Sequence, residues 1–70
     1  MVDEIVFMQA RIFRMFCIKH NYKAIEGNKI FEEQGIWKFI EDAYDMLHLN
    51  GDEYVLASIE NIIAAKGVKL

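Results

Sequence analysis

The chain has 70 residues and a formal net charge of −3, and 54% of its residues are hydrophobic. This length has room for a single domain, over residues 1–70, with a small core. The one cysteine excludes an intrachain disulfide and suits a reducing compartment. No apolar run approaches the roughly twenty residues of a membrane-spanning helix, and acidic residues stand where a signal peptide carries positive charge. We therefore expect a complete cytoplasmic protein without a membrane segment.

A first helix is predicted from Asp3, a suitable N-cap, to His20. At about 100° per residue its apolar residues occupy two neighbouring sectors, which predicts the central helix of the domain. These sectors hold Ile5, Met8, Ile12, Met15 and Phe16, and beside them Val6, Ala10, Phe13 and Cys17. The remaining sector combines two cations with two apolar groups and predicts a contact for a partner: Phe7, Arg11, Arg14 and Ile18. Packing of these apolar groups under neighbouring loops is the alternative.

A second helix is predicted over residues 24–33, with Ile30 and Phe31 as its anchors. Gly27 lowers its stability by about 1 kcal/mol relative to alanine, and we expect that another backbone passes close to it. Gly35 is expected to end this helix in the left-handed conformation. A third helix then begins at residue 36, and its buried face is expected to include Ile36, Trp37, Phe39, Ile40 and Ala43, followed by Tyr44, Met46, Leu47 and Leu49.

The fourth helix is marked by Asn50 and Glu53, which have the spacing of a capping box, and by Gly67 at its end. Its core stripe is Val55, Leu56, Ile59, Ile62 and Ile63. The opposite side of this helix has small, uncharged side chains: Tyr54, Ala57, Ser58, Asn61, Ala64 and Ala65. It predicts self-association, and a neutral solvent-facing surface is the equal alternative. Together the elements predict an all-α fold, a bundle of about four helices in a single domain.

An acidic segment covers residues 30–60, where Lys38 is the one cation. Such a segment argues against nucleic acid and for a basic protein partner, although a solvated acidic surface is the simpler alternative. The partner-binding candidates on it are Glu32, Glu33, Glu41, Asp42 and Asp45, with Trp37 as an anchor if it is exposed.

Residues for catalysis or cofactor binding do not form a pattern, so we predict neither an enzyme nor a cofactor. Ser58 has no histidine at helical spacing, and Cys17 lies on an apolar sector where a thiol stays protonated. No glycine-rich loop for a small-molecule phosphate is present. Cys17 with His20 and Asp45 with His48 form two pairs at ligand spacing, but chance pairing is the simpler explanation, and we predict no metal site.

A helix-turn-helix regulator that binds DNA is the alternative function, because the second and third helices flank a turn at Gly35. Its recognition helix would carry Lys38 against three acidic residues, and phosphate repels carboxylates. We therefore rank a protein partner above nucleic acid.

Five stretches carry a resemblance to a known family: residues 7–14, 35–40, 44–48, 51–54 and 59–63. The most distinctive are Tyr-Asp-x-Leu-His at 44–48 and Gly-x-Glu-Tyr at 51–54. Together they resemble a family of short, uncharacterised bacterial helical proteins, a domain of unknown function. The resemblance implies an organism among gut and related anaerobic bacteria, and a neighbouring gene for a larger protein similar to ADP-ribosyltransferases. It implies a toxin–antitoxin module, in which this chain is the small antitoxin-like protein, and it brings no catalytic residues.

Overall fold

The computed structural model describes residues 2–70, and from Glu4 onwards also their side chains. It contains four helices: α1 (Val2–His20), α2 (Ala24–Glu33), α3 (Ile36–Leu47) and α4 (Asp52–Ala65). No strand occurs within residues 2–70, which confirms the prediction of a small all-α domain. None of these helices has both the length and the apolar character needed to cross a membrane.

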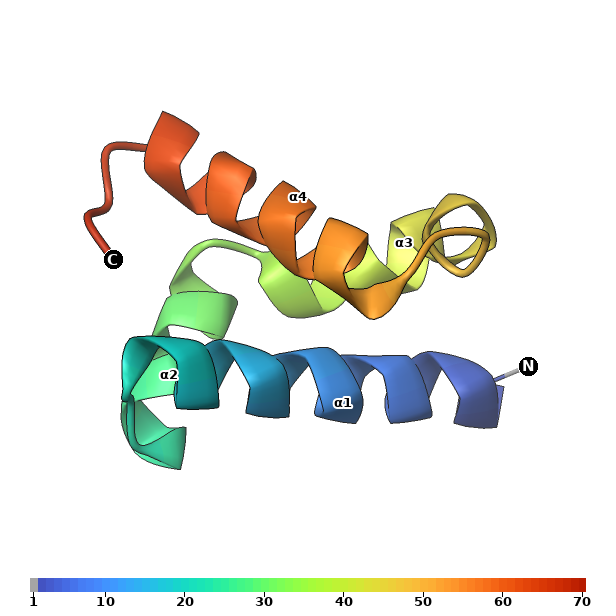
Figure 1. Cartoon of the computed structure of the whole chain (residues 1–70), viewed down its shortest axis with the longest axis horizontal. Coiled ribbons are helices and arrows are strands. Elements are labelled where there is room, and N and C mark those ends of the chain that lie inside the picture. Colours follow the sequence, from blue (N-terminus) through green and yellow to red (C-terminus); the bar gives the residue numbers. More distant parts are fainter. Residues whose placement is uncertain (1) are drawn as a thin grey trace.

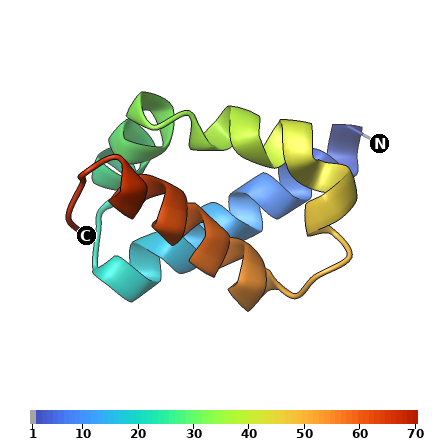
Figure 2. The same ribbon diagram turned by 90° about the horizontal axis from the view of Figure 1, so that it is seen from above.

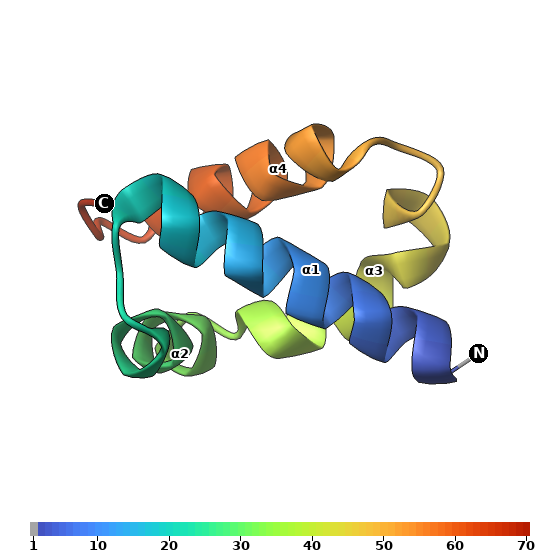
Figure 3. The ribbon, with the colours of Figure 1, turned by 60° about the horizontal axis from the view of Figure 1, so that its bottom comes forward.

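The helices are arranged around α1, which contacts each of the other three. In Figure 1, α1 runs along the lower edge of the molecule and α4 lies above it at an angle. Figure 2 shows the crossing of α1 and α4 from above, with α3 at the edge of the view. In Figure 3, α1 crosses the middle of the view with α4 above it and α2 below it, and α3 runs behind α1 from the side of α2 to the turn that leads into α4. The seam between α1 and α4 is therefore on a different side of α1 from α2, and the end of α3 reaches one end of this seam.

The core consists of apolar side chains from all four helices, as the sequence predicts. Ile12 and Phe16 of α1, Phe31 of α2 and Ile59 of α4 are fully buried. Phe31 also joins an aromatic cluster, because its ring lies 5.2 Å from that of Phe13 and 4.9 Å from that of Trp37. The remaining buried hydrophobic residues are Met8, Ile36, Ile40, Leu47, Val55, Leu56 and Ile63.

Two helix ends differ from the sequence prediction. The N-cap of α4 is Gly51, in an extended conformation, whereas the amide of Asn50 donates to the carbonyl oxygen of Met46. The predicted capping box of Asn50 and Glu53 is therefore wrong, because the Asn50 side chain is already used to close the end of α3. A glutamate in the capping-box position is found at the start of α2 instead. There, Glu26 accepts a hydrogen bond from the backbone N–H of the N-cap residue Lys23 at 2.8 Å.

The left-handed turn at Gly35, with φ of 68°, confirms the predicted boundary between α2 and α3. Gly67 also has a positive φ, 83°, after the end of α4. The expected N-cap at Asp3 differs, because α1 begins at Val2 and residue 3 lies within its first turn; the Asp3 side chain is outside the described residues.

Gly27 is approached closely by side chains, whereas the sequence predicted a close approach of another backbone. A Cβ at this position would collide with Sγ of Cys17 and would lie 3.2 Å from the ring of Phe13. Both of these residues belong to α1, so Gly27 lets α2 pack directly on α1. The expectation was right about the need for space and wrong about what occupies it.

Four residues expected to be buried are exposed. Leu49 is 77% exposed because α3 ends at Leu47 and Leu49 lies in the following turn. Met46 lies within α3 and is 56% exposed, because at about 100° per residue it points to a different side of the helix from buried Leu47. Val6 is 49% exposed and Ala10 is also exposed. Only Phe13 and Cys17 of that sector lie against α2, so the sector is covered only in its C-terminal half.

Candidate functional site

A bidentate ion pair between α1 and α4 organises the surface that we call the α1–α4 seam. Arg11 Nε donates to Asp52 Oδ2 at 2.6 Å, and its Nη2 donates to Asp52 Oδ1 at 3.1 Å. The hydrogen bond to Asp52 raises the pKa of Arg11 above its ordinary value. Asp52 lies in the first turn of α4, where a carboxylate also interacts favourably with the helix dipole. This pair positions the start of α4 against the middle of α1.

A second ionic cluster joins the two helices nearer the end of α1. Glu60 of α4 accepts a hydrogen bond from Lys19 Nζ at 3.0 Å and lies 2.7 Å from His20 Nε2. Burial alone would raise the pKa of Glu60, but the hydrogen bonds to Lys19 and His20 outweigh it, so this pKa lies below its ordinary value. The seam is therefore held by side-chain contacts at two levels, Arg11 with Asp52 and Glu60 with its two cations.

A hollow of about 550 Å³ opens in the seam between these two contacts. Its apolar lining comes from both helices: Met15 and Ile18 of α1, and Leu56 and Ala57 of α4. Ile18 is 71% exposed, so its side chain is available at the surface. The polar lining residues are Lys19, Glu53 and Glu60. Glu53 makes no hydrogen bond or ion pair within the part of the chain that the structure describes.

A second hollow, of about 320 Å³, lies along the same seam towards the start of α1 and is lined by Phe7, Arg11 and Asp52 among others. On its α3 side, the rings of Tyr44 and His48 stack at 5.1 Å with an interplanar angle of 12°. Burial raises the pKa of Tyr44, and so does neighbouring Glu4, which accepts its hydroxyl hydrogen bond at 3.5 Å.

The two most distinctive stretches of the sequence, residues 44–48 and 51–54, lie next to each other in the structure around the pair of Tyr44 and His48. His48 Nδ1 lies 2.9 Å from the carbonyl oxygen of Tyr44, and Asp52 holds Arg11 of α1. The stretches at 44–48 and 51–54 thus form the corner at which α3, the connecting turn and α4 meet α1.

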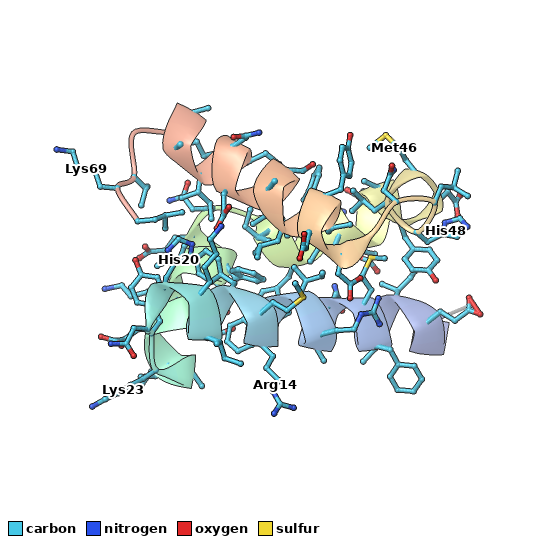
Figure 4. All side chains as sticks on the ribbon, viewed as in Figure 1. Arg14, His20, Lys23, Met46, His48 and Lys69 are labelled. Atoms are coloured by element: carbon cyan, nitrogen blue, oxygen red, sulfur yellow. The ribbon has the colours of Figure 1, made fainter. Side chains whose placement is uncertain are left out.

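The predicted contact stripe of α1 runs along the outside of the bundle. Phe7 is 65% exposed and lines the second hollow, whereas Ile18 lines the first. Arg14 makes no hydrogen bond or ion pair with any described residue, and Figure 4 shows its side chain pointing away from the bundle. Arg11 is instead engaged with Asp52. The stripe therefore borders the seam at Phe7, Arg11 and Ile18, whereas Arg14 points away from it.

The acidic candidates are all exposed, on α2 (Glu32 and Glu33) and on α3 (Glu41, Asp42 and Asp45). Glu32 accepts a hydrogen bond from Asn28 at 2.9 Å, and Asp42 lies 3.4 Å from Lys38.

Trp37, the proposed anchor, is half-buried. Its Nε1 donates to Asn28 at 3.0 Å, and its ring packs on Phe13 and Phe31. Most of this side chain therefore serves the contact between α1, α2 and α3, and only part of it remains for a partner.

The uncharged side of α4 is largely exposed, as the self-association prediction requires. Tyr54 is 52% exposed, and Ala57, Asn61 and Ala64 are exposed as well. Ser58 is half-buried, and its hydroxyl donates to the carbonyl oxygen of Tyr54 at 3.0 Å. Ala57 also lines the first hollow, so this side of α4 adjoins the α1–α4 seam.

The residues considered as metal ligands lie apart. His20 and His48 are at opposite ends of the bundle in Figure 4. His20 contacts Glu60, and the thiol of Cys17 packs by Gly27, where burial raises its pKa. Within the described residues, no three His, Cys, Asp or Glu side chains gather in a metal-binding arrangement.

The fold and the seam define a small all-α domain with an open, partly apolar groove on its surface. Residues 12–66 match the model of a family described as Protein of unknown function (DUF3791). The chain belongs to this family. Comparisons with curated proteins and with solved structures found no match. The matched range includes Ile18 and all of α4, whereas Phe7 and Arg11 precede it.

Proposed function

We propose that this protein is a protein-binding module, the small antitoxin-like partner of a toxin-like protein encoded beside it in a bacterial genome, and that it acts in the cytoplasm. The observation that carries the proposal is the exposure of Phe7 and Ile18, at 65% and 71%, on one outward stripe of α1 beside two arginines. Aromatic residues and arginine are enriched where proteins meet.

The energetics of this stripe favour burial by a partner. Removing a large apolar side chain such as Phe7 or Ile18 from water contributes on the order of 1.5–3 kcal/mol. Exposed apolar groups that lie together beside polar residues are typical of interaction surfaces. Arg14, which has no partner among the described residues, adds a charged donor at the centre of the stripe.

The acidic surface of α2 and α3 supports a basic partner. Exposed charges of one sign accelerate association with an oppositely charged surface and have less effect on the lifetime of the complex. We assign Glu41, Asp42 and Asp45 this steering role.

The same carboxylates favour a protein partner over DNA. In a helix-turn-helix reading α3 is the recognition helix, and it exposes these three acids beside Lys38. Phosphates repel such a helix.

The resemblance to bacterial proteins encoded beside ADP-ribosyltransferase-like proteins supports the antitoxin role. In the direct test, the product of the adjacent gene is expressed in a heterologous host with and without this chain. We expect growth arrest by the larger protein alone, relief on co-expression, and a complex that survives gel filtration. The proposal is wrong if the two proteins elute separately at about 10 μM each, since a complex with a Kd of about 1 μM or lower is mostly formed at this concentration.

A further inference from the structure

We propose that the α1–α4 seam is a groove for a basic amphipathic helix of the partner protein. This inference rests on the proposed function and specifies its binding site and the chemistry of the segment that fills it. The groove has two separate hollows along it, one at Ile18 and Ala57 and one at Phe7 and Arg11, and the bound helix would lie over both.

The spacing of the two hollows fits a helix. Phe7 and Ile18, which line one hollow each, are separated by three helical turns of α1, or about 16 Å. A partner helix aligned with α1 covers the same distance between apolar residues at i and i+11. Helices that bind in grooves use apolar residues repeated at three- and four-residue spacing in this way. The volume of the larger hollow, about 550 Å³, accommodates such side chains.

The charge of the lining selects a basic helix. The charged side chains that line the larger hollow are Lys19, Glu53 and Glu60, which gives it a formal charge of −1. Those that line the smaller hollow are Arg11, Glu4 and Asp52, and its formal charge is also −1. Both cations are already paired, with Glu60 and with Asp52. Glu53 has no partner among the described residues, so it remains to accept a hydrogen bond from a lysine or arginine of the bound helix.

The framework of the groove is formed before binding. The Arg11 contact to Asp52 and the Lys19 and His20 contacts to Glu60 link α1 to α4 across 40 or 41 positions of sequence. A groove whose walls are fixed in this way loses little conformational entropy when a helix binds. A second copy of this chain is the competing occupant, because the uncharged side of α4 adjoins the same seam.

The test uses ¹⁵N-labelled full-length chain and a synthetic peptide of about eighteen residues, long enough for three turns and both ends. The peptide has leucines on one helical face at positions i, i+4, i+7 and i+11, with lysine and alanine elsewhere. A peptide of the same composition, with the leucines distributed around the helix, is the reference. We expect saturable amide shifts at residues 15–19 and 53–60 with the patterned peptide, and binding by the reference that is at least about tenfold weaker. Shifts centred on α2 and α3 overturn the inference.

A matched pair of double variants identifies the groove. Ile18→Gln with Ala57→Gln removes an apolar wall and fills the larger hollow, whereas Ile25→Gln with Ala64→Gln makes the same changes outside it. Ile25 is 79% exposed, which matches Ile18. We expect about tenfold weaker peptide binding for the first variant and a change within about twofold for the second. Equal effects overturn the inference.

Two further results separate this inference from the proposed function. If the neighbouring protein binds the chain and the groove variant leaves that affinity unchanged, the groove is wrong and the protein-binding function stands. If the amides of the seam shift on dilution without peptide, and the peptide fails to compete, the occupant is a second copy and the inference is overturned. Patterned binding at the seam supports the groove even if the neighbouring protein does not bind, in which case the proposed partner is wrong.

Discussion

The contact between Gly27 and Cys17 gives a sharp test of the packing of α2 on α1. In Gly27→Ala the new Cβ would collide with Sγ of Cys17 and would lie 3.2 Å from the ring of Phe13. Overpacking of this kind costs about 1–3 kcal/mol. Alanine returns about 1 kcal/mol of helix propensity, so we expect a net loss of up to about 2 kcal/mol in the free energy of unfolding.

A double-mutant cycle separates the clash from other effects. Cys17→Ala removes Sγ, so Gly27→Ala should be less destabilising, or stabilising, in that background, with a coupling energy of about 1 kcal/mol or more. Gly51→Ala is the control, because no heavy atom lies within 4 Å of its Cβ and φ is −72°. Gly51 is the N-cap of α4, where glycine is preferred over alanine, so this substitution should cost up to about 1 kcal/mol, and by the same amount in both backgrounds. Urea denaturation followed by circular dichroism measures all of these values. Equal effects of Gly27→Ala in both backgrounds would refute the argument that this glycine makes room for the thiol.

Three further predictions concern the surface. The pKa of Glu60 is lower in the folded protein than in the unfolded chain, where it is about 4.3. Its ion pairs therefore stabilise the fold fully above this unfolded pKa, and the stabilisation is lost as the pH falls through the folded pKa. The urea midpoint should accordingly fall less between about pH 5 and pH 3 in Glu60→Gln than in the unmodified chain. Ala57→Glu with Ala64→Glu should abolish self-association at about 100 μM in light scattering, because charge would be buried at the contact; a monomer already in the unmodified chain contradicts self-association. Glu41→Lys with Asp42→Lys should slow association with the partner and flatten its salt dependence without loss of helicity, and unchanged kinetics would mean that these acids are only solvated.

Local features of the fold were predictable from sequence because their causes are local. Gly35 ends a run of helical residues at a position that needs a positive φ, so the boundary between α2 and α3 follows from one residue. The apolar periodicity of α4 placed Val55, Ile59 and Ile63 in the core, where the structure has them. The predicted cap at Asn50 was wrong because the Asn50 side chain donates to the carbonyl oxygen of Met46 at the end of α3, and spacing alone does not show which helix end uses a side chain between two helices.

The seam was not predictable because it depends on residues far apart in the chain. Arg11 and Asp52 are separated by 41 positions, as are Lys19 and Glu60, and no pattern in a single sequence pairs them. Ile18 and Ala57 were each predicted to lie on an outward surface of their own helix. That the two line one hollow follows only from the way in which α4 crosses α1.

Hydrogen–deuterium exchange of the chain, alone and in complex with the product of the adjacent gene, shows whether a partner covers the α1–α4 seam. Backbone amides exchange more slowly where a partner covers and stabilises the structure. The account predicts a complex in which protection increases at residues 7–18 of α1 and at 53–60 of α4. Protection confined to α2 and α3, or no change at protein concentrations of about 10 μM, would contradict it.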